Sequence, residues 1–144
     1  MSTTCKSHVR RAPAVVRSAE DALATLAIAT RDARDTCVVV ASLDASHRPQ
    51  ILLVIDGATS TDVGRAVDLL LAAAGAAEAR AVVANMFVAC SGRAAREPGE
   101  AECWLLREVD RRAERAEVRL LDWFMLFEGS AVSVAERAGW TPRW

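Results

Sequence analysis

The sequence predicts a single domain of the α/β (α+β) class, in which helices pack on a mixed β-sheet. Apolar, β-branched runs of strand length alternate along the chain with longer segments whose apolar residues recur at helical spacing. The chain has 144 residues, a length that suits one domain with a real hydrophobic core. Apolar residues make up 52% of it, yet no apolar run reaches the roughly 20 residues that a membrane-spanning helix needs.

The first half of the chain predicts a helix, two strands and a second helix. Ser18 suits the N-cap of the first helix. Cys37–Leu43 is a continuous apolar run, typical of a strand buried on both faces, and Ile51–Ile55 predicts a second strand. Ser60 or Thr61 can cap the second helix. The apolar face of that helix comprises Val63, Ala66, Val67, Leu70, Leu71 and Ala74.

The second half predicts a strand, a helix and a closing hairpin. Ala81–Ala89 reads as a third buried strand, and Pro98 suits the first turn of the helix that follows. Val118–Phe127 and Ala131–Val134 then form a hairpin. The apolar residues of the helix repeat at Ala101, Leu105, Val109 and Ala113. The expected order is therefore α-β-β-α-β-α-β-β.

The expected domain covers residues 17–139, between a flexible arm (1–16) and a short tail (140–144). Trp104 and Trp123 are expected in core packing. Trp140 and Trp144 of the tail would be costly if left wet, so they either fold back onto the domain or meet a partner. A homodimer is one such arrangement.

Charge and composition narrow the function classes. The net charge of −1 gives no general attraction to nucleic acid or to an anionic membrane. The N-terminus lacks a signal-peptide pattern, so we expect a cytoplasmic protein without a membrane partner. The four cysteines form no Cys-x-x-Cys pair and are expected to be reduced. With only His8 and His47 present, a histidine-rich metal or catalytic site is not expected.

Three stretches, taken in order, resemble the RadC-like branch of the JAB/MPN domains. The order and spacing of these pieces carry the resemblance, which spans roughly residues 16–139. It implies a mixed sheet flanked by helices, with the layering of cytidine deaminases. The stretches are Arg17–Ala22 with the helix leading to Val38–Leu43, the polar turn Asp44–Arg48, and Leu120–Trp123 followed by Gly129–Arg137.

Active JAB/MPN domains are zinc hydrolases of the isopeptidase or peptidase type. Their ligands are a His-x-His pair and an Asp on the next helix, with a Ser between them and an upstream Glu that acts on the metal-bound water. Three protein ligands leave one zinc position open for that water, whose pKa the metal lowers toward neutrality.

The resemblance places the site of this family on residues that cannot rebuild it. In the order upstream Glu, two His, Ser and Asp, its positions fall at or near Thr36, Ala89, Ser91, Gly99 and Glu102. In addition, Trp123 stands where a His is expected beside Asp122. Only Glu102 keeps a possible ligand oxygen, so we expect neither zinc nor another cofactor. The predicted function is that of a catalytically inactive module that binds a protein partner or a small ligand.

Two alternative hypotheses assign a catalytic function to the same loop. Cys90 and Arg96 match the Cys-x5-Arg phosphate loop of cysteine phosphatases, in which a low-pKa thiolate attacks phosphorus. A replacement metal site could instead use Cys90, Glu102 and Cys103, giving a residual metallohydrolase. However, Glu102 and Cys103 are adjacent on a predicted helix and diverge by roughly 100°. Arg93 and Arg96, close to a helix N-terminus, leave weak anion binding open.

Overall fold

In the computed structural model the described part of the chain forms one mixed five-stranded sheet in the order β2-β1-β3-β4-β5. The structure describes residues 13–30, 36–76, 83–92, 97–127 and 129–144. Only β3 and β4 are parallel; the other neighbours are antiparallel. The elements are α1 (Ala19–Ala29), β1 (Cys37–Leu43), β2 (Pro49–Asp56), the 3-10 turn η2 (Ser60–Asp62), α2 (Val63–Ala76), β3 (Asn85–Ser91), α3 (Glu100–Arg115), β4 (Arg119–Phe127), β5 (Ser130–Ser133) and α4 (Val134–Arg137).

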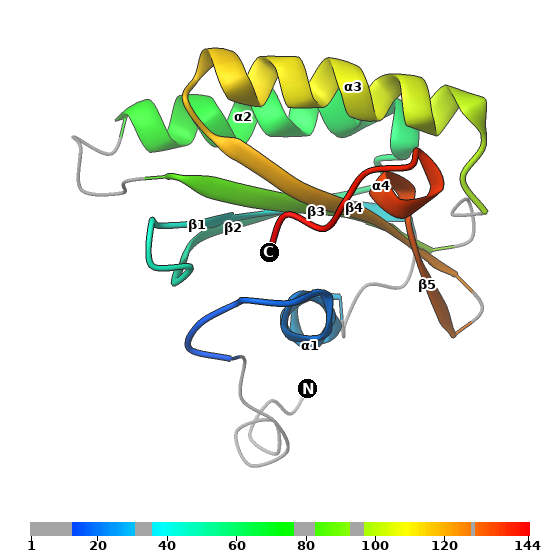
Figure 1. The fold of residues 1–144 in the computed structure, drawn as a ribbon, viewed down its shortest axis with the longest axis horizontal. Coiled ribbons are helices and arrows are strands. Elements are labelled where there is room, and N and C mark those ends of the chain that lie inside the picture. The colour runs from blue at the N-terminus through cyan, green and yellow to red at the C-terminus, as the bar shows by residue number, and fades with distance from the viewer. Residues whose placement is uncertain (1–12, 31–35, 77–82, 93–96, 128) are drawn as a thin grey trace.

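The sheet lies between two helical layers, which confirms the predicted fold class. Helices α2 and α3 lie side by side on one face, and α1 crosses the opposite face (Figure 1). The alternation of side chains along each strand divides the core into two. Val38 and Val40 of β1 pack toward α2 and α3, whereas Val39 and Ala41 pack toward α1. β1 is buried over its whole length, as its continuous apolar run predicts.

Several predicted boundaries are confirmed by local chemistry. The Ser18 hydroxyl accepts a hydrogen bond from the Asp21 N–H and caps α1. β1 spans the predicted Cys37–Leu43, and the closing hairpin forms as expected from β4 and β5. The structure adds the short helix α4, whereas the sequence pattern predicted that Val134 ends the last strand. Its N-cap is Ser133, whose hydroxyl accepts from the Glu136 N–H.

Other boundaries were wrong by a few residues. Thr59, rather than Ser60 or Thr61, is the N-cap of the turn before α2. The backbone N–H of Thr59 donates a hydrogen bond to the Asp62 carboxylate at 2.9 Å. The third strand was predicted to begin at Ala81, but β3 begins at Asn85. Residues 83–84 precede the strand, and residues 81–82 lie outside the described residues.

The buried face of α3 also differs from the predicted one. Val109 and Ala113 are buried as expected, but the next inward positions are Leu106 and Glu102. The predicted positions are spaced by four residues, whereas the helix has 3.6 residues per turn. Positions spaced in this way rotate around the helix, so only two of the four lie on the buried face.

Both ends of the described chain pack on the domain. Val16, expected in the flexible arm, is fully buried, and its N–H donates to the His47 carbonyl at 2.8 Å. At the other end, the Trp144 ring centroid lies 5.8 Å from that of Phe87 and 6.4 Å from that of Phe124. The tail therefore folds back onto the α1 side of the sheet, one of the two arrangements that the sequence left open.

Among the described residues, no helix has the length and apolar character needed to cross a membrane.

Candidate functional site

The predicted site lies where β3 ends and α3 begins. β3 and β4 run parallel and both end at this side of the sheet. Ligands of α/β proteins commonly bind beyond the carboxyl ends of such strands. The structure describes residues 89–92 and 97–102 of the loop, whereas Arg93 and Arg96 lie outside the described residues. The anion site predicted from these two arginines therefore stays a prediction.

Ala89, Ser91 and Glu102 do not converge on one point. Ala89 is fully buried in the core on the α1 side, and Ser91 lies opposite Cys37, a member of the same core. Glu102 lies on the buried face of α3, in the layer on the other side of the sheet. Successive side chains of a strand point to opposite faces, so positions 89 and 91 share the face that α3 does not cover. A ligand pair at those positions would point away from Glu102.

Cys90 is the strand residue that faces the α3 layer. It is 2% exposed and packs in the core beneath α2 and α3. Burial raises the pKa of its thiol from 9.0 to about 12, and only the nearby indole of Trp123 opposes this rise. Cys90 is therefore a protonated thiol at neutral pH. A phosphatase nucleophile needs the reverse, a thiolate stabilised by its surroundings.

Trp123 fills the space next to Cys90. Its side chain is 1% exposed, confirming its expected place in the core. The indole lies near enough to the Cys90 thiol to offset part of the rise in its pKa, but Nε1–H of Trp123 has no hydrogen-bond partner among the described residues. A bulky ring thus occupies the position at which the resemblance expects a histidine.

The carboxylate of Asp122, next to Trp123 in β4, accepts hydrogen bonds from its surroundings. Asp122 accepts hydrogen bonds from the Trp123 N–H at 2.7 Å and from the Ser133 hydroxyl at 2.8 Å. Burial nevertheless raises the pKa of the Asp122 carboxyl. Because Ser133 also caps α4, this carboxylate joins β4 to the start of that helix. Its contacts are those of a structural residue.

Glu102 is 3% exposed and also has a structural task. Its Oε2 accepts a hydrogen bond from the N–H of Gly99, the N-cap of α3, at 3.1 Å. A carboxylate three residues after an N-cap is the second half of a capping box and also favours the positive helix end. The Gly99-x-x-Glu102 spacing is the sequence signal that could have revealed this role. Gly99 itself supplies a backbone donor here.

The upstream position, Thr36, lies at the same end of the sheet, just before β1. Its carbonyl accepts the Gly57 N–H at 2.7 Å and so ties the start of β1 to the end of β2. No group of three or more His, Cys, Asp or Glu side chains in the described part of the chain could hold a metal ion. The alternative set of Cys90, Glu102 and Cys103 is thus not assembled. Cys90 is buried in the core, whereas Cys103 packs at the edge of that core and lines the surface hollow described next.

That hollow opens beside the loop, at the first turns of α3. It has a volume of about 550 Å³ and is lined in part by Cys103, Trp104, Arg107 and Arg137. Trp104 is 60% exposed, so its expected place in the core was wrong. It lies on the outer side of α3 because the buried face runs through Glu102 and Leu106. Arg137 forms an ion pair with Glu97, which connects α4 to the loop.

Neither models of known protein families nor curated protein sequences match this chain.

Proposed function

We propose that this domain is a catalytically silent, RadC-like JAB/MPN domain that acts as a protein-interaction module. One observation carries the proposal. The strand end that would supply ligands presents Ala89 to one core and Cys90 to the other, and the carboxylate of Glu102 caps α3. Each of these side chains packs in a core or caps a helix, and none is placed to act on a bound substrate.

The surface beside the loop supports binding rather than catalysis. An exposed tryptophan next to arginines combines the residue types that contribute most to protein–protein contacts. Trp104 and Arg107 come from one face of α3, and Arg137 comes from α4, so the hollow is formed by elements that pack on each other. A partner could contact this surface without any rearrangement of the core.

Metal content and hydrolysis test the silent half of the proposal. We expect the purified full chain to hold no stoichiometric zinc and to cleave neither peptides nor isopeptide-linked substrates. One zinc per chain that is lost in Glu102→Gln, but kept in the matched control Glu100→Gln, would overturn the proposal if peptidase activity followed the metal. Glu100 lies in the same first turn of α3 but is exposed.

An aryl phosphate assay separates the runner-up, a cysteine phosphatase. The protein should not hydrolyse para-nitrophenyl phosphate, since its Cys90 thiol is protonated. Hydrolysis abolished by Cys90→Ser and kept in Cys103→Ser would replace the proposal with the phosphatase reading.

The binding half can be tested by position-specific crosslinking in cells. A photoreactive amino acid in place of Trp104 should give discrete crosslinked protein species. The same group in place of Glu114, an exposed residue in the last turns of α3, is the control. Equal crosslinking at the two positions, or none at either, would exclude the hollow as a specific contact surface.

A further inference from the structure

The outer edge of β2 is the one long strand edge that no described residue covers. β2 pairs with β1 alone, and it ends the sheet on that side. The opposite side is treated differently. There the short β5 pairs with the end of β4, and Arg143 of the tail donates to the Leu120 carbonyl at 3.1 Å near its beginning. On that side the last strand is thus only four residues long, whereas β2 presents an unpaired edge from Pro49 to Asp56.

The backbone of β2 has groups ready for another strand. The Ile51 N–H donates to the Ser42 hydroxyl of β1, and the Gly57 N–H donates to the Thr36 carbonyl that precedes β1. Backbone groups alternate in direction along a strand, so the even positions between them direct their N–H and C=O groups outward. These positions are Leu52, Val54 and Asp56.

The side chains of this edge are apolar and exposed. Leu52 is 46% exposed and Val54 is 38% exposed, both on the α1 side of the sheet. On the other side, Leu69 of α2 is 50% exposed and lines a hollow together with Ile55. Exposed edge strands in monomers usually carry lysine, an internal proline or an inward charge. The run Ile51–Ile55 has none of these.

We propose that two copies of this chain pair through their β2 strands, antiparallel and about a two-fold axis at Leu53. In that register Leu52 lies opposite Val54 and Ile51 lies opposite Ile55 of the second copy. The polar end residues Gln50 and Asp56 then lie opposite each other. A shift of the axis to Leu52 or Val54 would set Gln50 against Val54 or Asp56 against Leu52. The apolar sequence is therefore self-complementary in one register.

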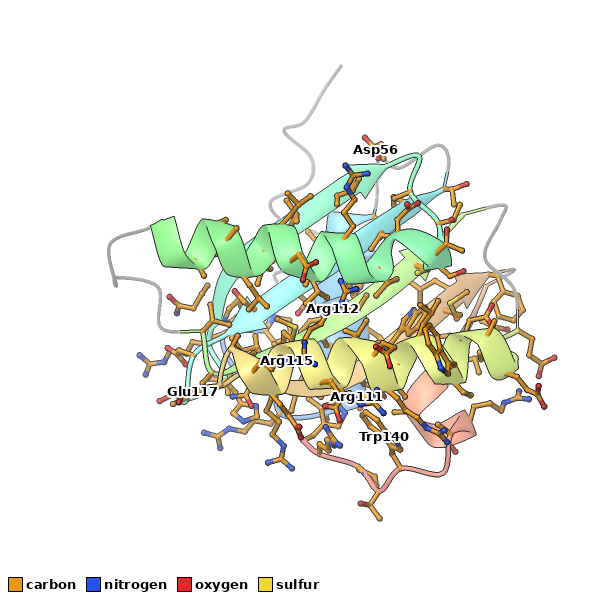
Figure 2. The ribbon with its side chains drawn as sticks, turned by 90° about the horizontal axis from the view of Figure 1, so that it is seen from above. Asp56, Arg111, Arg112, Arg115, Glu117 and Trp140 are labelled. Carbon is orange, nitrogen blue, oxygen red and sulfur yellow. The ribbon has the colours of Figure 1, made fainter. Side chains whose placement is uncertain are left out.

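Charge at the two ends of the strand favours the same arrangement. Arg48 and Asp56 are exposed, and neither forms an ion pair with another described residue. The antiparallel pair brings Arg48 of each copy to the end at which Asp56 of the other copy lies, within reach of a long side chain. Asp56 lies at the outer end of β2, away from α3 (Figure 2).

The pairing gives a closed, isologous dimer with one continuous sheet, in which no β2 edge stays open. It places the α2 helices of both copies on the same face, with Leu69 of each toward the axis. This inference goes beyond the proposed function, because it uses no residue of the loop or of the Trp104 hollow. Failure of either proposal leaves the other standing.

Sedimentation velocity of the full chain over a wide concentration range tests the dimer. We expect a monomer–dimer equilibrium that Val54→Pro weakens at least about tenfold, or by about 1.4 kcal/mol. Proline at this position removes an outward N–H and leaves the bonds to β1 intact. Val54→Thr keeps the N–H and the branched side chain and is the matched control. If Val54→Pro does not fold, as judged by circular dichroism, Leu52→Lys tests the same contact without changing the backbone.

A charge exchange tests the register. Asp56→Arg and Arg48→Asp should each weaken the dimer, whereas the double variant should restore much of the lost affinity. A chain that stays monomeric at every concentration would overturn the proposal. So would a dimer whose dissociation constant is unchanged by Val54→Pro, by Leu52→Lys and by the charge variants, because that dimer uses another surface.

Discussion

Arg143 and Asp110 form a partly buried ion pair that joins the end of the described chain to α3. Nη1 of Arg143 lies 2.9 Å from Oδ1 of Asp110, and the two side chains are 26% and 16% exposed. The same guanidinium lies over the ring of Trp140, with Cζ 3.9 Å from the ring centroid. Figure 2 shows Trp140 beside α3, on the side of the molecule away from Asp56. One arginine therefore holds the tail, α3 and β4 together.

Replacement of that arginine should destabilise the fold. We expect Arg143→Ala to lower the free energy of unfolding by about 1–3 kcal/mol, because it leaves the partly buried Asp110 carboxylate without its charged partner. Urea unfolding followed by circular dichroism measures the change. Arg111→Ala is the control, since Arg111 is 62% exposed in its pair with Glu108. That exposed pair should be worth about 0–1 kcal/mol. Equal losses in the two variants would contradict a special role for Arg143.

Cys90 should make the protein less stable at alkaline pH. Its folded-state pKa is about 12, above the ordinary 9.0, so the unfolded state releases the proton first. The contribution of Cys90 is fully present below pH 9 and is lost as the pH rises toward 12. Urea unfolding at a series of alkaline pH values should show a shallower loss in Cys90→Ala than in the native chain. The slope will not vanish, because burial also raises the pKa of Cys37. Identical slopes would show that the thiol is not buried.

Asp122 should give a second pH dependence, on the acid side. Its pKa is raised above 3.8 by burial, so between 3.8 and that higher value the folded state holds a proton that the unfolded state has lost. Stability from this group is therefore highest below pH 3.8 and falls as the pH rises through the folded-state pKa. The difference in unfolding free energy between the native chain and Asp122→Asn should follow that trend. Asp68→Asn, which changes an exposed carboxylate, is the matched control.

Sequence-based prediction was most accurate for elements whose burial does not depend on which face packs against a neighbour. The apolar run Cys37–Leu43 is buried on both faces, so its bounds could be read without knowledge of the layers around it. Ser18 was likewise readable, because a cap is a local hydrogen bond. Prediction was less accurate where the neighbouring element determines which side chains of a helix are buried. On α3 the polar Glu102 is buried and the aromatic Trp104 is exposed, the reverse of their usual preferences.

The geometry of the candidate site could not be predicted from spacing alone. Ala89 and Glu102 belong to the same loop region, but which face of the sheet receives α3 is a property of the whole topology. One residue decides the outcome: Cys90 points toward α3, and its two neighbours in the chain point away from it. The tail posed a similar problem, since Trp144 could be assigned to Phe87 only once both layers were known.

The position of Trp144 in the aromatic cluster of the α1-side core has a consequence for biosynthesis. Synthesis proceeds from the N-terminus, and this ring reaches Phe87 and Phe124 only after residue 144 has left the ribosomal tunnel. Until then the α1-side core lacks its last aromatic ring, and the edge of β4 lacks the arginine that contacts it. A nascent chain stalled shortly before this point would leave Phe87 and Phe124 without that ring contact and the Leu120 carbonyl without its Arg143 donor. The α1-side core can therefore complete its aromatic packing only once residues 143 and 144 have emerged.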